Sequence, residues 1–177
     1  MDKTQSPSLG GLILTMGALI VALVYIFVAF NTEDPLWFYT KFDEQPVEIF
    51  LNCYGNEVLI VPGDPQYGGL VALVNKTLSG RKNWDSLTMS NATYQEYLTS
   101  PDMMVMELYY SPQVRIHSFY RYFSNLDSLV IPLVGRHAQT NAVFGRSNNQ
   151  NTAGSLHYNG IPDIRAYIEN EGICTTP

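Results

Sequence analysis

The hydrophobic pattern of the chain begins with a charge-free run at residues 9–30. As a helix with a rise of about 1.5 Å per residue, this run would extend about 33 Å, which is enough for a hydrocarbon core of roughly 30 Å. A cleaved signal peptide has a shorter apolar region that ends in small residues, whereas this run ends at Phe30. We therefore predict an uncleaved transmembrane helix over residues 9–30, preceded by a cytoplasmic tail at residues 1–8.

The charges that flank this run predict its orientation. Lys3 precedes it, whereas Glu33 and Asp34 follow it and the next base is Lys41. By the positive-inside rule, the N-terminus is cytoplasmic and the remainder of the chain extracytoplasmic. We expect a single-pass plasma-membrane protein with membrane lipid around residues 9–30. Tyr25 and the aromatic residues at 37–39 suit the membrane–water interface.

Small residues are spaced along this helix so that another helix can approach closely. They are Gly10, Gly17, Ala18 and Ala22, the last two forming a small-xxx-small pair. They predict packing against a membrane-protein partner. The alternative is that glycine and alanine are simply common in membrane spans.

Beyond residue 46 the pattern alternates between strand and helix periods. The strands expected from period-two alternation are residues 47–53, 57–61, 103–110, 114–119, 129–134, 141–145 and 155–158. Helices are expected over residues 65–79, with Asp64 as N-cap, over about 91–98, and over 162–170. This order predicts the α+β class: a mainly antiparallel sheet with about three helices against one face, spanning residues 47–177. Residues 111–113 are expected to form a hairpin turn, and Pro132 to mark a bulge or an edge.

Acidic residues dominate the stretch between the apolar run and residue 64. The whole chain has a formal net charge of -6, and residues 31–64 hold seven acids and one base, Lys41. We expect residues 31–46 to be an acidic membrane-proximal linker that is solvated, holds the domain off the bilayer or meets a basic partner. Net acidity argues against nucleic-acid binding.

Two cysteines, Cys53 and Cys174, lie near the two ends of the predicted domain. In an oxidising compartment they are expected to form a disulfide, which would close a loop of about 120 residues. Two buried free thiols are the alternative.

Basic side chains gather in the predicted strand region. Arg115, His117, Arg121, Arg136 and Arg146 are candidates for binding an anion or a partner. Pairing with acids of this chain or of another subunit is the interpretation we favour. His117, His137 and His157 match no metal-ligand signature, so we predict neither a metal nor a cofactor.

Signatures of catalysis are missing from the sequence. The hydrolase elbow, P-loop and dinucleotide motifs do not occur, and Ser118, His117 and Asp127 make a triad only on paper. Asn75 and Asn91 match the glycosylation acceptor pattern. We expect a non-catalytic accessory, assembly or regulatory subunit of a membrane complex. The alternative is a tethered sensor or binding domain for a small anion, and a hydrolase is a third, weaker hypothesis.

Overall fold

The computed structural model of the protein describes residues 8–174, so residues 1–7 of the predicted tail lie outside the described residues. The helices are α1 (Leu9–Thr32), α2 (Tyr67–Leu78), α3 (Asn91–Thr99) and α4 (Ile161–Asn170), with short 3-10 turns η1 (Arg121–Phe123) and η2 (Ala138–Thr140). The strands are β1 (Glu48–Cys53), β2 (Asn56–Ile60), β3 (Asn83–Asp85), β4 (Met104–Val114), β5 (Leu126–Val134), β6 (Ala142–Ser147), β7 (Gln150–Asn151) and β8 (Ser155–His157). The predicted α+β class is confirmed.

The strands of the described chain form one antiparallel sheet in the order β2-β1-β4-β5-β6-β8-β3, with β7 paired to β6. β5 lies in the interior of the sheet between β4 and β6, as its continuous apolar sequence predicts. Pro132 lies beyond Val130, where the pairing with β6 ends, and the register with β4 shifts between Met104 and Val105. The absence of an N–H at Pro132 is tolerated at this irregularity.

The β1–β2 hairpin follows directly from the sequence. Ile49, Leu51 and Cys53 are buried at alternate positions, as expected for a strand with one face in the core. Tyr54 and Gly55 form the connection, and both have positive φ values, 56° and 86°. Two-residue turns with this backbone match the right-handed twist of the paired strands.

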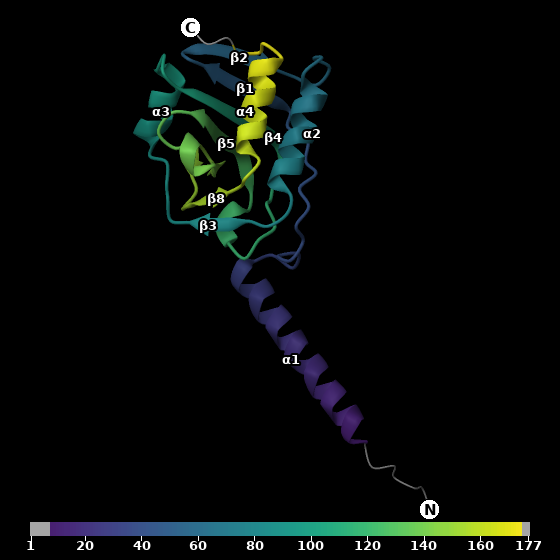
Figure 1. Cartoon of the computed structure of the whole chain (residues 1–177). Helices are drawn as coiled ribbons and strands as arrows, with labels where there is room; N and C mark the ends of the chain where they lie inside the picture. The colour runs from purple at the N-terminus through teal and green to yellow at the C-terminus, as the bar shows by residue number, and fades with distance from the viewer. Residues whose placement is uncertain (1–7, 175–177) are drawn as a thin grey trace, which may run out of the picture.

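Helices cover both faces of the sheet. On one face, α2 and α4 close the larger core, to which α4 contributes Ile161, Ile164 and Ile168, in agreement with the predicted apolar side of this helix. Figure 1 shows α2 and α4 side by side over the sheet. α3 covers the opposite face, where Tyr94 and Tyr97 belong to a second core. The expectation that all helices lie against one face is therefore wrong.

The predicted hairpin at residues 111–113 is also wrong. β4 continues to Val114 with an irregular register opposite β5 between Tyr109 and Val114, and residues 115–119 are not a strand. The reason is that a proline suits a strand irregularity as well as a turn, because both leave its missing N–H without a ladder partner.

Two further elements differ from the prediction: α2 begins later than expected, and β3 is an additional strand. The carboxylate of Asp64 accepts the N–H of Val61 at 2.8 Å, so it does not cap α2, whose N-cap residue is Gln66. β3 was not predicted because its three side chains are exposed and show no alternation. The position of β3 is fixed by its antiparallel pairing with β8, in which Trp84 lies opposite Leu156.

The predicted disulfide between Cys53 and Cys174 is present. The two Cα atoms lie 5.4 Å apart, and the bond joins the end of β1 to the chain after α4 across a sequence separation of 121 residues. In the chain-entropy model, a loop of this length stabilises the fold by about 4–5 kcal/mol.

The apolar helix α1 extends away from the domain (Figure 1). It begins at the N-cap Ser8, whose hydroxyl accepts the N–H of Gly11 at 3.2 Å, and it ends at Thr32, two residues beyond the predicted end. In the described residues it is the one helix long and apolar enough to cross a membrane. None of its apolar stretch is buried against the domain.

Candidate functional site

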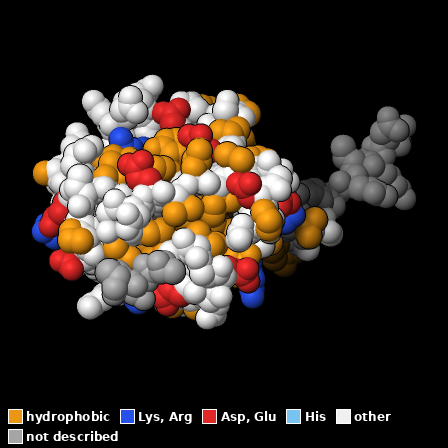
Figure 2. Space-filling model, turned by 90° about the horizontal axis from the view of Figure 1, so that it is seen from above, with side chains coloured by type: hydrophobic (Ala, Val, Ile, Leu, Met, Phe, Trp, Pro, Cys, Tyr) orange, Lys and Arg blue, Asp and Glu red, His pale blue; other side chains and the backbone are white. Residues whose placement is uncertain are grey.

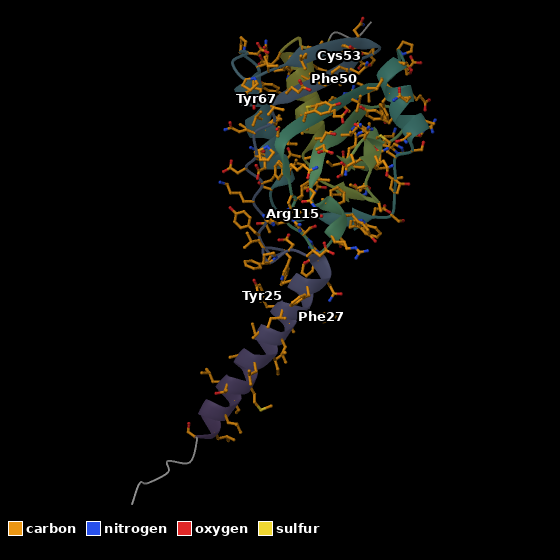
Figure 3. All side chains as sticks on the ribbon, turned by 180° about the vertical axis from the view of Figure 1, so that it is seen from behind. Tyr25, Phe27, Phe50, Cys53, Tyr67 and Arg115 are labelled. Atoms are coloured by element: carbon orange, nitrogen blue, oxygen red, sulfur yellow. A yellow bond between two sulfur atoms is a disulfide. The ribbon has the colours of Figure 1, made fainter. Side chains whose placement is uncertain are left out.

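The C-terminal end of α1 is fixed to the domain through Asp34, which is 2% exposed. Nδ1 of His117 lies 3.0 Å from each carboxylate oxygen of Asp34, and the N–H of Leu36 donates to Oδ1 at 2.9 Å. Arg115 lies alongside, with Nη1 4.0 Å from Oδ2 of Asp34 and 2.9 Å from the carbonyl oxygen of Glu33, to which it donates. Figure 3 shows Arg115 at the end of the domain nearest α1.

The end of α1 places Asp34 for these contacts. Glu33 adopts the left-handed conformation with a φ of 54°, which reverses the chain as in many helix C-termini. The N–H of Asp34 then donates to the carbonyl of Ala29 at 3.1 Å, so the turn remains connected to the helix. Phe42 is buried as well, so the segment predicted as a linker packs onto the domain at both of these points.

Lys82 completes the charged cluster at this junction. Its Nζ donates to the carbonyl oxygens of His117 at 2.9 Å and of Thr40 at 3.3 Å. Burial lowers the pKa of Lys82 to about 8, while the nearby charge of Asp34 acts in the opposite direction.

A pocket of about 430 Å³ lies beside this cluster. Three segments that are distant in the sequence form it: residues 37–40, 80–83 and 117–120. Aromatic side chains supply much of its wall, and Arg81, Lys82 and His117 supply its basic groups. Because Lys82 and His117 are already bonded within the chain, the pocket is an amphipathic cleft with few unengaged basic groups.

A second buried carboxylate, Glu107, lies on the α3 face of the sheet and is 1% exposed. It accepts hydrogen bonds from the hydroxyls of Tyr94 and Ser128, each at 2.5 Å, and its Oε1 lies 3.5 Å from Nε of Arg146. The guanidinium of Arg146 also lies over the ring of Tyr94 at 3.8 Å. Burial and the bond to Glu107 raise the pKa of Tyr94 to about 12. Each of these partners belongs to the chain itself, so this cluster has the features of a structural ion pair.

The five basic residues singled out in the sequence do not converge on one site. Arg115 and His117 meet at Asp34, and Arg146 contacts Glu107. The other two are elsewhere: Arg136 pairs with Glu96 at 3.1 Å, and Arg121 lies 5.7 Å from the ring centre of Tyr122.

The histidines likewise have separate surroundings. His157 Nδ1 lies 2.6 Å from the carbonyl oxygen of Thr140, and His137 packs on Phe144. Burial, followed by the charge of Arg136, lowers the pKa of His137. Within residues 8–174, no group of three or more histidine, cysteine or acidic residues is placed to hold a metal ion.

The remaining candidates have simple placements. The asparagine of each acceptor pattern lies on a helix: Asn75 in α2, with its amide donating to the carbonyl of Glu44 at 3.0 Å, and Asn91 at the start of α3. Asp127 accepts hydrogen bonds from the side chain of Gln113 and from the N–H of Asn148, whereas His117 bonds to Asp34. The triad of Ser118, His117 and Asp127 is therefore not assembled.

The small residues of α1 form an open surface. Gly10, Gly17, Ala18 and Ala22 are exposed, and a Cβ atom added to Gly10 or Gly17 would meet no atom within 4 Å. Nothing in the described part of the chain packs against this stretch of α1.

The acids between α1 and residue 64 are separated in space. Asp34 is buried at the junction, whereas β1 and β2, which carry Glu48 and Glu57, lie at the end of the domain away from α1 (Figure 1). Figure 3 places Cys53 at the same far end. Position in the sequence therefore gave a wrong estimate of which charges lie near α1, because β1 carries the chain away from the helix.

No protein-family model, curated protein or solved structure matches this chain. The chemistry of the described residues is therefore the basis for the function proposed below.

Proposed function

We propose that the protein is a single-pass membrane protein whose extracytoplasmic domain is a non-catalytic accessory, assembly or regulatory subunit of a membrane complex. The observation that carries this proposal is that the apolar stretch of α1 is not buried against any other part of the described chain. An apolar surface of this size requires a cover of lipid or protein.

The proposed orientation has the N-terminus in the cytoplasm of a cell whose plasma membrane holds α1. Lys3 precedes the helix and Glu33 follows it, which favours this direction. The disulfide between Cys53 and Cys174 supports it, because such bonds persist in oxidising compartments.

The proposed contact with a partner uses the small residues of α1. In a helix, Gly10 and Gly17 occupy one strip, and Ala18 and Ala22 occupy the strip beside it. Small side chains allow close packing of membrane helices. Because Asp34 bonds α1 to the domain, a partner that holds α1 also fixes the position of the domain above it.

The arrangement of the arginines favours a protein-binding role over capture of a small anion. Arg115, Arg136 and Arg146 each have an acceptor within the chain, from Glu33, Glu96 and Glu107 respectively. An anion would have to displace these groups.

The test is co-purification of the full chain from native membranes in mild detergent. A partner in stoichiometric amount is expected with the wild-type chain, and Ala18→Ile is expected to reduce its recovery at least about tenfold by preventing close approach. Leu23→Ile is the matched control, because Leu23 lies on the opposite side of α1 and receives the same side chain. Recovery of a lone monomer from wild-type membranes would overturn the proposal.

A further inference from the structure

Aromatic side chains gather at the end of the domain that adjoins α1. They come from the segment after α1, from β3 and from the segment after β4. We call this surface the aromatic base, and its residues are Trp37, Phe38, Tyr39, Trp84, Phe119 and Tyr122. Figure 1 shows β3 at the same end of the domain as α1.

The rings of the aromatic base continue from α1 onto the domain. The ring of Tyr25, within α1, lies 6.4 Å from that of Phe38. Phe38 lies 5.6 Å from Trp37, which lies 4.5 Å from Phe119. The helix and the underside of the domain thus share one aromatic surface.

The pocket beside Asp34 connects these rings to those of β3. Phe119 and Tyr120 both line the pocket, and Tyr120 stacks on Trp84 with 5.6 Å between ring centres. Tyr122 stacks on the same indole at 6.5 Å.

Much of the aromatic base is uncovered. Phe119 is 60% exposed, Phe38 55%, Tyr39 45% and Tyr122 42%. Large exposed aromatic side chains concentrated on one surface mark an interaction site, whereas single exposed ones do not.

The depth of Phe38 along α1 indicates what covers this surface. The hydroxyl of Tyr25 donates to the carbonyl of Pro35 at 3.1 Å, so the segment after α1 folds back along the helix. Tyr25 follows Leu9 by sixteen residues, or about 24 Å of helix, which is less than the roughly 30 Å of hydrocarbon that α1 has to cross. A helix that spans a bilayer from Leu9 therefore brings Phe38 to the level of the lipid headgroups or below.

The charges around the aromatic base are compatible with lipid headgroups. Arg81 lines the pocket and Arg121 lies beside Tyr122, and both arginines are exposed. Of the acids at this end of the domain, Asp34 is buried and bonded to His117, whereas Glu33 and Asp85 are exposed. Figure 2, which looks onto the opposite end of the domain, shows acidic side chains spread over that face together with some basic ones. Lipid headgroups carry both phosphate and cationic groups, so an aromatic base with both kinds of charged side chain is compatible with them.

We propose that the aromatic base docks onto the lipid surface, with its rings at the membrane–water interface and its basic side chains at the lipid phosphates. This inference rests on the proposed membrane anchoring by α1 and adds that the domain sits on the bilayer. It replaces the expectation that acidic charge holds the domain away.

The two tryptophans of the chain, Trp37 and Trp84, both belong to the aromatic base and report on it directly. The full chain is reconstituted into nanodiscs of lipids brominated on the acyl chain near the headgroup, and into nanodiscs of unbrominated lipids. The expected result is that bromination removes about half of the tryptophan emission, because interfacial rings contact that part of the lipid. Iodide in the aqueous phase is expected to quench little.

Variants show whether the exposed rings hold the base in the lipid. Phe38→Ser with Phe119→Ser is expected to lower the ratio of quenching by bromine to quenching by iodide several-fold. Leu59→Ser is the control, because Leu59 is 56% exposed but lies on β2 at the far end. Thermal unfolding of both variants in detergent checks that the fold is retained.

The outcomes separate this inference from the anchoring on which it rests. Co-elution with nanodiscs, with equal emission in both lipids and strong quenching by iodide, overturns docking and leaves the aromatic base open to a protein partner. Failure to co-elute with nanodiscs overturns the anchor and the docking together.

Discussion

Asp34 and His117 are 83 residues apart in the chain, and their side chains lie 3.0 Å from each other. One belongs to the segment that leaves α1 and the other to the segment that leaves β4. Their contact gives the apolar helix a defined direction relative to the domain.

Asp34→Asn is expected to weaken this junction. The change keeps the size of the side chain but removes the acceptor pair that holds His117 and the charge beside Arg115. We expect a loss of about 1–3 kcal/mol in the free energy of unfolding and faster hydrogen exchange over residues 34–40. Glu33→Gln is the control, because it removes an exposed neighbouring charge. Equal exchange in the two variants would contradict the role of Asp34.

Lys82 is expected to titrate with a midpoint of about 8, measured by NMR of its ammonium group. Lys41 is the internal reference, because a hydrogen bond and the charge of Asp43 raise its pKa. Asp34→Asn should lower the pKa of Lys82 further by removing a favourable charge. A midpoint near the ordinary 10.5 would show that Lys82 is solvated.

The same shift has a consequence for stability. Because the pKa of folded Lys82 lies below 10.5, the folded chain loses this proton at lower pH than the unfolded chain. The contribution of Lys82 to stability is complete above pH 10.5 and is lost as the pH falls through about 8. In denaturant titrations, Lys82→Met should flatten that part of the pH profile.

Glu107 and Arg146 form a buried ion pair in which each charge is compensated by the other. Glu107→Ala leaves the guanidinium of Arg146, 11% exposed, without its carboxylate and is expected to cost about 3–5 kcal/mol. The double variant Glu107→Leu with Arg146→Leu should recover much of that loss. Glu96→Ala breaks the exposed pair with Arg136 and is expected to cost about 0–1 kcal/mol. Additive losses at Glu107 and Arg146 would contradict their coupling.

Breaking the disulfide is expected to lower the free energy of unfolding by about 4–5 kcal/mol, because Cys53 and Cys174 close a long loop. Denaturant unfolding with and without reductant measures this difference. The variant with Cys53→Ser and Cys174→Ser should show the same loss and no response to reductant. A response in that variant would mean that the reductant acts elsewhere.

The elements that the sequence predicts well are those with a local cause. Ser90 caps α3 through the N–H of Thr93 at 3.0 Å, and the alternation at Ile49 and Leu51 reports the core face of β1. β3 has no such local signal, because its place depends on pairing with β8. The continuation of β4 past Pro112 likewise depends on its partner, β5.

The same distinction applies to the site residues: some can be recognised from their local sequence, whereas others are identified only by contacts between distant parts of the chain. Arg115 and His117 are recognisable from the sequence as members of a group of basic residues. Their acceptor, Asp34, belonged to a run of acids with nothing to distinguish it. Glu107 did leave a signal, because it is the one acid in the apolar run at residues 103–110, and a buried acid requires a partner.

The most direct test of the account is which side of the membrane each end of the chain occupies. The native cysteines are bonded to each other, so a cysteine introduced by Thr4→Cys or by Leu59→Cys is the only thiol that an impermeant maleimide can label. We expect labelling of the Leu59→Cys chain in intact cells and of the Thr4→Cys chain only after permeabilisation. The reverse pattern, or labelling of both in intact cells, would contradict a single-pass protein with an extracytoplasmic domain.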